Sequence, residues 1–150
     1  MPIEDQEARG VSARGGESAD GSRAVSLRLR LGPSDARYAD GMVAGAKVLE
    51  LFGDLATEIA IRESGIEGLC AAYDSVEFLE PVRAGDYVEA RAWVARVGET
   101  SRTIEATLHR VIASHGDGTA SVLAPARVCA RAQGTLVIKP GPTRERGSTG

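Results

Sequence analysis

The sequence predicts an α+β fold in which one long central helix is wrapped by a five-stranded antiparallel sheet. Apolar residues recur at steps of three and four in only one long segment, from about residue 42 to residue 63, and this spacing is helical. Five other segments alternate apolar with polar residues, which is typical of half-buried strands. The order is one strand, the helix and then four strands, so one helix must serve the whole sheet.

The first strand is expected at residues 25–31, where four apolar residues alternate with polar ones before the Gly32 to Asp35 turn. The apolar positions of the helix are Met42, Ala46, Leu49, Phe52, Ala56, Ile59 and Ala60. One polar sector gathers Lys47, Glu50, Asp54, Thr57, Glu58 and Arg62. The remaining surface is apolar and wider than a surface helix needs. We therefore expect the helix to lie against the sheet with further cover from elsewhere.

The four later strands are expected at residues 71–80, 87–97, 103–112 and 127–138. Turn and loop residues separate them: Pro81 with the Gly85-Asp86 turn, a short hairpin loop at 98–101, and a polar, glycine-containing loop at 114–119. In the last strand, alternate apolar residues from Val128 to Ile138 share one face. These runs complete the five strands of the sheet.

Composition predicts one domain with two tails. Residues 1–23 are rich in Gly, Ser, Glu, Asp and Arg and are expected to form a disordered or loosely ordered tail. Residues 24–139 are expected to form the folded domain, and residues 140–150 a flexible tail. A domain of this size can bury one core but not two.

Charge and hydropathy exclude several classes of function. The formal net charge of -3 argues against a nucleic-acid partner, because binding phosphate chains needs clustered Lys and Arg. No apolar stretch reaches the roughly 18 residues that a membrane helix requires, and the chain begins with acidic residues instead of a basic and apolar signal. We therefore expect no membrane contact and a cytoplasmic protein.

The two cysteines, Cys70 and Cys129, are far apart and lack the Cys/His spacing of a zinc site. Both are expected to be buried structural thiols. The two histidines, His109 and His115, belong to no set of nucleophile, base and acid that their spacing supports. Each is expected at the surface, and the sequence predicts no metal site.

Three stretches resemble the hotdog-fold acyl-CoA thioesterase superfamily: residues 39–45 (ADGMVAG), 76–86 (VEFLEPVRAGD) and 97–102 (VGETSR). More narrowly, residues 46–58 (AKVLELFGDLATE) with 72–78 (AYDSVEF) resemble the 3-aminobutyryl-CoA ammonia-lyases of lysine fermentation. The resemblance covers residues 25–138. It implies the hotdog fold and a homodimer, or a higher oligomer built from dimers, that joins two sheets edge to edge.

The resemblance further implies reversible removal of ammonia from a 3-aminoacyl-CoA such as 3-aminobutyryl-CoA, giving crotonyl-CoA. Coenzyme A is then part of the substrate, and no metal or redox cofactor is expected. Elimination requires a base for the proton beside the thioester carbonyl and a donor that polarises this carbonyl. An acyl-CoA thioesterase and a non-catalytic acyl-CoA binding module are the alternatives, because one scaffold hosts many functions.

Three carboxylates are candidates for the chemistry. Glu50 is the first choice as base because it lies at the margin of the polar sector, beside Ala46 and Gly53; the alternative is a solvated helix glutamate. Asp54 lies one turn later on the same side of the helix. It either binds the substrate ammonium or is a plain surface residue. When this helix is aligned with the helices of thioesterase-like proteins, the catalytic Asp of those proteins falls at the position of Gly53. Asp74 has the strand parity of the apolar face, where an acid needs a partner or a purpose.

Six further residues are candidates for binding the substrate. Gly41 to Gly45 lead into the helix and are expected to supply the backbone donor for the carbonyl oxygen. Tyr38 and Asp40 either line the acyl pocket or shape the turn before the helix. Arg83 and Arg102 either meet the phosphates of coenzyme A or are solvated charges.

Overall fold

The computed structural model describes residues 24–138 and confirms the predicted fold class. The strands are β1 (Val25–Arg30), β2 (Leu69–Phe78), β3 (Tyr87–Val97), β4 (Ser101–Ser114) and β5 (Ala120–Val137). The helix is α3 (Gly45–Ser64), and two short 3-10 helices, η2 (Pro33–Asp35) and η3 (Ala39–Gly41), precede it. The predicted tails, residues 1–23 and 140–150, lie outside the described residues. No helix within the described range is long and apolar enough to span a membrane.

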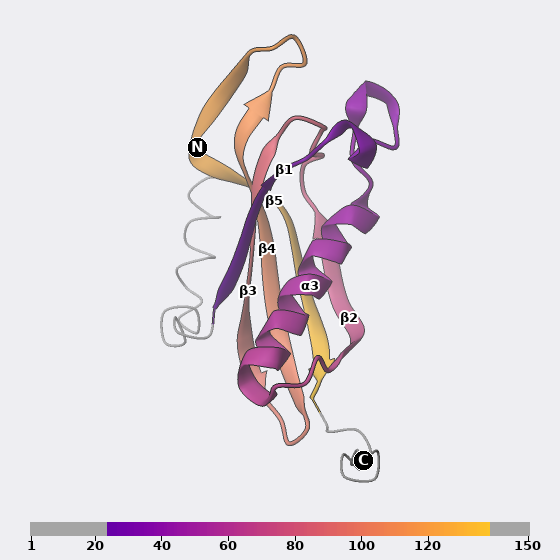
Figure 1. Ribbon diagram of the computed structural model, residues 1–150, viewed down its shortest axis with the longest axis vertical. Coiled ribbons are helices and arrows are strands. Elements are labelled where there is room, and N and C mark those ends of the chain that lie inside the picture. The colour runs from indigo at the N-terminus through magenta and orange to yellow at the C-terminus, as the bar shows by residue number, and fades with distance from the viewer. Residues whose placement is uncertain (1–23, 139–150) are drawn as a thin grey trace, which may run out of the picture.

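The five strands form one antiparallel sheet in the order β1-β3-β4-β5-β2, and α3 lies across one face of it (Figure 1). The helix buries Val48, Leu51, Phe52, Leu55, Ala56, Ile59 and Ala60. The inner face of the sheet adds alternate residues of the central strands, among them Val88, Ala90, Ala92, Val94, Ile104, Ala106, Leu108, Ala130, Ala132 and Leu136. Small alanines in the sheet let the helix pack closely. The predicted alternation of these strands is confirmed.

The helix begins at Gly45, three residues later than the apolar periodicity predicted. The preceding segment is held in another conformation, because Met42 forms an isolated bridge with Arg83 and the N–H of Val43 donates to the carbonyl of Val82 at 2.9 Å. Gly41 has a φ of 70°, a backbone angle that favours glycine. Pairing with residues 82–83 therefore overrides the helical pattern there.

The outer edge strand β2 departs from strict alternation, and the predicted orientation of Asp74 is wrong. The register against β5 shifts twice, between Cys70 and Ala72 and between Tyr73 and Ser75. The second shift is a bulge at Asp74, which is exposed, whereas Tyr73 turns toward the helix. The residues of β2 with most cover are consequently Cys70, Tyr73 and Val76, three residues apart.

Both strands of the β4–β5 hairpin are longer than predicted. Strand β5 begins at Ala120 instead of residue 127, and β4 continues to Ser114. The register shifts between Leu108 and His109 and again between Arg110 and Ile112. Beyond these irregularities the hairpin extends past the body of the sheet (Figure 1).

A buried carboxylate closes the turn between β2 and β3. Asp86 is 2% exposed, and its side chain accepts the backbone N–H of Arg83 and that of Ser114, each at 2.8 Å. These bonds join the turn to the end of β4. Because an unpaired buried carboxylate is costly, the two donors explain how Asp86 is tolerated in the interior.

Candidate functional site

A pocket of about 420 Å³ lies where the first turn of α3 meets the sheet. This volume falls within the range of small-ligand sites. The lining is mostly apolar and consists of Tyr38, Met42, Val43, Gly45, Val48, Phe78, Leu79, Glu80, Pro81, Val82, Leu108, Cys129 and Ala130. The pocket therefore suits an apolar group that carries a polar end.

The start of α3 supplies hydrogen-bond donors to this pocket. The N-cap residue, Ala44, provides no side-chain cap, and the N–H groups of a first helical turn lack acceptors within the helix. Gly45 is the first helical residue, and a Cβ there would lie 2.7 Å from Cζ of Phe78. Only glycine leaves room for the Phe78 ring against the helix. The N–H of Lys47 donates to the carbonyl of Ala44 at 3.0 Å, whereas within residues 24–138 the N–H of Gly45 has no acceptor. The helix terminus thus meets the pocket with the Gly45 donor and positive potential.

One wall of the pocket, residues 79–82, is tied to β4 and β5. The carbonyl of Cys129 accepts the N–H of Leu79 at 2.8 Å and that of Glu80 at 3.2 Å. The Glu80 carboxylate accepts Nη2 of Arg110 at 2.8 Å and Nη2 of Arg127. Nη1 of Arg110 donates to the carbonyl of Pro81 at 2.8 Å. This wall is therefore fixed relative to the sheet by both backbone and charged contacts.

Cys129 lies in the lining of the pocket and, as predicted, is a buried free thiol. Burial raises the pKa of its thiol to about 11, against the opposing effect of the nearby Arg110 charge. A thiol with this pKa is protonated at neutral pH and is a poor nucleophile. Its contribution to the pocket is therefore shape.

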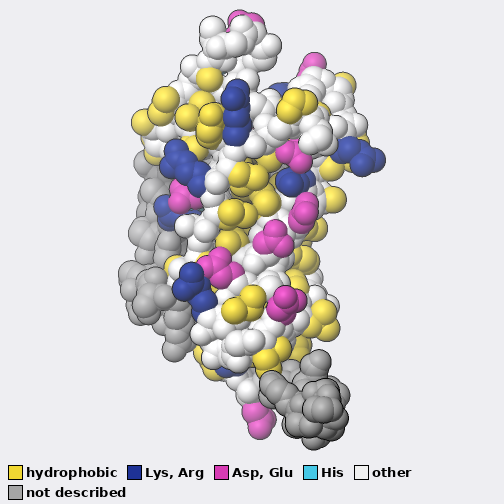
Figure 2. Space-filling view, in the orientation of Figure 1, with side chains coloured by type: hydrophobic (Ala, Val, Ile, Leu, Met, Phe, Trp, Pro, Cys, Tyr) yellow, Lys and Arg dark blue, Asp and Glu magenta, His cyan; other side chains and the backbone are white. Residues whose placement is uncertain are grey.

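Glu50 and Asp54 lie on the outward face of α3, in the single chain, and not in the lining of the pocket. The Glu50 side chain is 64% exposed, and its Oε1 lies 3.6 Å from Nζ of Lys47. The same Nζ lies 3.5 Å from Oδ1 of Asp35, which the sequence did not single out. Asp54 is exposed as well. Figure 2 shows acidic side chains spread over this face of the molecule. The partial desolvation predicted for Glu50 is absent from the described chain.

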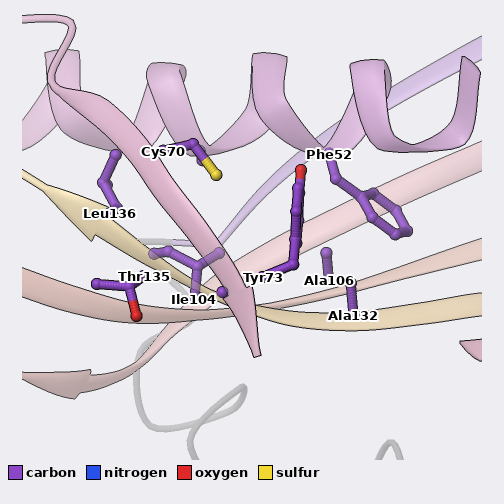
Figure 3. A pocket seen from close by; sticks show the side chains of 10 residues that line it. Phe52, Cys70, Tyr73, Ile104, Ala106, Ala132, Thr135 and Leu136 are labelled. Atoms are coloured by element: carbon purple, nitrogen blue, oxygen red, sulfur yellow. The ribbon is translucent and has the colours of Figure 1, made fainter. Parts of the chain in front are cut away.

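A smaller pocket, of about 10 Å³, lies between α3 and the edge strand β2 (Figure 3). Tyr73 reaches from β2 toward the helix, and its hydroxyl donates to the carbonyl of Leu49 at 3.2 Å. Burial, together with the neighbouring Cys70 thiol, raises the pKa of Tyr73 to about 12. Cys70 is half-buried, less covered than predicted. This contact ties β2 to the helix one residue before Glu50.

Comparison with known proteins places the chain in a family. Residues 40–112 match the model of the thioesterase superfamily. The chain is 44% identical over 115 residues to a 3-aminobutyryl-CoA ammonia lyase of Acetoanaerobium sticklandii, covering 75% of this chain and 91% of that protein. The chain belongs to the 3-aminobutyryl-CoA ammonia lyase family.

One solved structure agrees with this membership in the ammonia lyase family, and a second shares the fold. The β-alanyl-CoA:ammonia lyase of Clostridium propionicum has a TM-score of 0.75 and 29% identity, covering 81% of this chain and 91% of that one. An acyl-CoA hydrolase of Staphylococcus aureus, solved with butyryl coenzyme A, coenzyme A and coenzyme A disulfide, has a TM-score of 0.62 at 19% identity. The match to this hydrolase covers 77% of this chain and 62% of the hydrolase chain, and it shows the shared fold.

The predicted binding residues of this ammonia lyase family member divide between two ends of the helix. Tyr38 and Gly45 line the larger pocket, and Gly41 and Arg83 lie next to it in the segments that the Met42–Arg83 bridge joins. Asp40 is exposed and has a φ of 63° in η3, so it shapes the turn and is absent from the lining.

Arg102 lies at the other end of α3. Its Nε donates to Oε1 of Glu63 at 2.8 Å, and its Nη1 donates to the carbonyls of Gly98 and Ser101. Arg102 therefore joins the last turn of the helix to the β3–β4 turn, and its contacts favour a structural role over a phosphate contact.

Sequence reasoning missed several residues around the larger pocket. Glu80, Arg110 and Arg127 come from three segments that meet only in the folded sheet, and no local pattern pointed to them.

His109 was predicted at the surface but is half-buried. Burial, followed by the Arg91 charge, lowers the pKa of its imidazole. Among residues 24–138, no group of three His, Cys, Asp or Glu side chains is placed to hold a metal ion.

Proposed function

We propose that this protein is a carbon–nitrogen lyase that reversibly removes ammonia from 3-aminobutyryl-CoA, or a similar 3-aminoacyl-CoA, to give crotonyl-CoA. The observation that carries the proposal is the 44% identity to the Acetoanaerobium sticklandii ammonia lyase, which the chain matches over 91% of its length. The 29% identity to the β-alanyl-CoA:ammonia lyase supports the same class of reaction. The apolar pocket at an uncapped helix terminus supports a thioester as the ligand.

In the proposed reaction the thioester carbonyl points toward the first-turn N–H groups at Gly45, because negative charge collects on its oxygen as the neighbouring proton is lost. Glu50 takes that proton. The electron pair of the C–H bond forms the double bond, and the C–N bond breaks to release ammonia. Ammonia then accepts the proton from Glu50 and leaves as ammonium.

Asp54 is proposed to bind the substrate ammonium, and Asp74 is kept as a further candidate. Tyr38 and Arg83 are proposed as substrate contacts at the pocket.

This scheme draws on a carboxylate, helix donors and the coenzyme A already present in the substrate, and it calls on no metal or redox cofactor. We propose a cytoplasmic location as well. Two cysteines that stay free in the folded domain support a reducing compartment.

A second copy of the chain is proposed to complete the site, as a homodimer or a larger assembly of dimers. Among the strands of residues 24–138, β2 stands at the end of the strand order and pairs with β5 alone. Open strand edges are ready templates for pairing, and large apolar side chains flank this one, with Leu69 65% and Phe78 55% exposed. A partner sheet joined at β2 would cover the side of α3 next to Glu50.

Sedimentation equilibrium tests the proposed assembly. At micromolar concentration we expect a mass of about twice the 15.7 kDa chain, or a multiple of that mass. Leu69→Lys places a charge at the β2 edge and is expected to weaken association. Val97→Lys is the control, because Val97 is similarly exposed, at 56%, but lies at the end of β3. A monomer at all concentrations would contradict the proposal.

The reaction is tested by incubating the purified protein with 3-aminobutyryl-CoA and following crotonyl-CoA and free coenzyme A by mass spectrometry. We expect crotonyl-CoA without free thiol. Free thiol without the enoyl product would identify a thioesterase, in which a carboxylate activates water or attacks the carbonyl. Tight binding with neither product would identify a binding module. The reverse reaction, from crotonyl-CoA and ammonia, checks reversibility.

A further inference from the structure

We propose that Arg127, together with Arg110, forms a phosphate-binding site at the wall of the larger pocket and takes a phosphate group of the coenzyme A portion of the thioester. The identity of the ligand rests on the proposed function. The existence of an anion site beside the pocket rests on the contacts of these arginines and is tested separately below.

The first observation is a local excess of positive charge. Arg110 and Arg127 face each other across the β4–β5 register, so their side chains leave the same face of the sheet. Like charges directly opposite each other destabilise a strand pair. One carboxylate, that of Glu80, serves both guanidinium groups. The three side chains together carry one positive charge.

The nearby carboxylate of Asp86 is already engaged. Its two oxygens accept the backbone N–H groups of Arg83 and Ser114. In the described part of the chain, no hydrogen bond or ion pair joins it to Arg110 or Arg127. The cluster retains the capacity to attract an anion.

The second observation is that Arg127 duplicates a contact instead of adding one. Arg110 alone ties the wall, since it bonds both the Glu80 carboxylate and the Pro81 carbonyl, and its side chain is only 15% exposed. Arg127 reaches the same carboxylate, but its side chain is 34% exposed. A purely structural clamp is complete without it. Arg127 is thus the member of the pair that an incoming ligand meets.

The third observation is unused donor capacity. Within the described residues, neither Nε of Arg110 nor Nε of Arg127 has a hydrogen-bond acceptor, although both atoms are buried. Buried donors of this kind are rarely left unpaired. A guanidinium fork matches the oxygens of a phosphate better than it matches any neutral group. Because Glu80 lines the pocket, a phosphate held here lies beside the cavity assigned to the thioester.

Binding of unmodified coenzyme A to wild type and to Arg127→Gln, by isothermal titration calorimetry, is the test. We expect the variant to bind coenzyme A about tenfold more weakly, the loss typical of one charge-assisted contact. Pantetheine, which has no phosphate, is expected to bind both proteins equally. Arg131→Gln is the matched control: it removes the same charge from the same strand, and its side chain is 37% exposed opposite Glu77 at 4.0 Å. It is expected to bind coenzyme A like wild type.

Equal coenzyme A affinities for wild type and Arg127→Gln would overturn the proposal, as would an equal loss of coenzyme A and pantetheine affinity, which indicates a structural role. Comparing 3′-dephospho-coenzyme A with coenzyme A shows which phosphate the site binds. If the difference in affinity between these two ligands disappears in the variant, the site binds the 3′-phosphate. If the difference is unchanged in the variant, the site binds the pyrophosphate.

Binding is measured without turnover, so a failure of the lyase assay leaves this result readable. If the lyase assay succeeds, the variant should raise KM for the coenzyme A thioester about tenfold with kcat within about twofold.

Discussion

Glu50→Gln is expected to lower kcat for ammonia elimination by about 10²- to 10⁴-fold, the usual contribution of a positioned general base. Glutamine keeps the size of the side chain and cannot accept the proton. Coenzyme A affinity should change little, because Glu50 is absent from the lining of the larger pocket. The measurement is the initial rate of crotonyl-CoA formation at saturating 3-aminobutyryl-CoA.

Two further variants on the same helix give this result its meaning. Glu58→Gln is the control, because Glu58 pairs with Arg62 at 2.8 Å and belongs to no proposed step; its kcat should match wild type. Asp54→Asn is expected to slow elimination as well, with a rise in KM if Asp54 binds the substrate ammonium. Undiminished elimination by both Glu50→Gln and Asp54→Asn would remove these residues from the site.

Asp86→Ala is expected to lower the free energy of unfolding by about 3 kcal/mol, the largest stability effect that we predict for a single polar side chain here. The substitution leaves the N–H groups of Arg83 and Ser114 without their acceptor and removes a buried anion that both stabilise. Asp86→Asn, which keeps one acceptor oxygen, should lose roughly half as much. Urea unfolding at pH 7, followed by circular dichroism, measures both.

Asp117→Ala is the matched control for this stability series. Asp117 also accepts a backbone N–H in a turn, from Thr119 at 2.9 Å, but it is exposed to water. Water replaces the lost acceptor there, so the free energy of unfolding should fall much less than it does for Asp86→Ala. Similar losses for Asp86→Ala and Asp117→Ala would show that burial is not the source of the effect.

The fold was predictable because each element repeats a simple period. Helical spacing from residue 45 to residue 63 and alternation in β3 have no competing signal, and both were assigned correctly. Strand β2 was assigned but its faces were not, because the bulges at Ala71 and Asp74 break the period of two. The start of α3 was misplaced because tertiary pairing of Met42 and Val43 outweighs local pattern.

The site was predictable only where it lies within one segment. Gly45 and Tyr38, singled out from the stretch that leads into the helix, line the larger pocket, and their contact with substrate stays a prediction. The cluster of Glu80, Arg110 and Arg127 joins residues 30 and 47 positions apart, and spacing in the chain gives no sign of such a contact. The contact between Arg102 and Glu63 went unpredicted for the same reason, since the two residues lie 39 positions apart.

The buried thiol in the pocket bears on how such an enzyme survives its own chemistry. Crotonyl-CoA is an electrophile, because its carbon–carbon double bond is conjugated to the thioester, and thiolates add to such bonds to form a stable thioether. With a pKa of about 11, Cys129 is ionised at pH 7 to only about one part in 10⁴. Burial thus lets a small, polarizable side chain shape the cavity while sparing the protein from alkylation by the product of the proposed reaction.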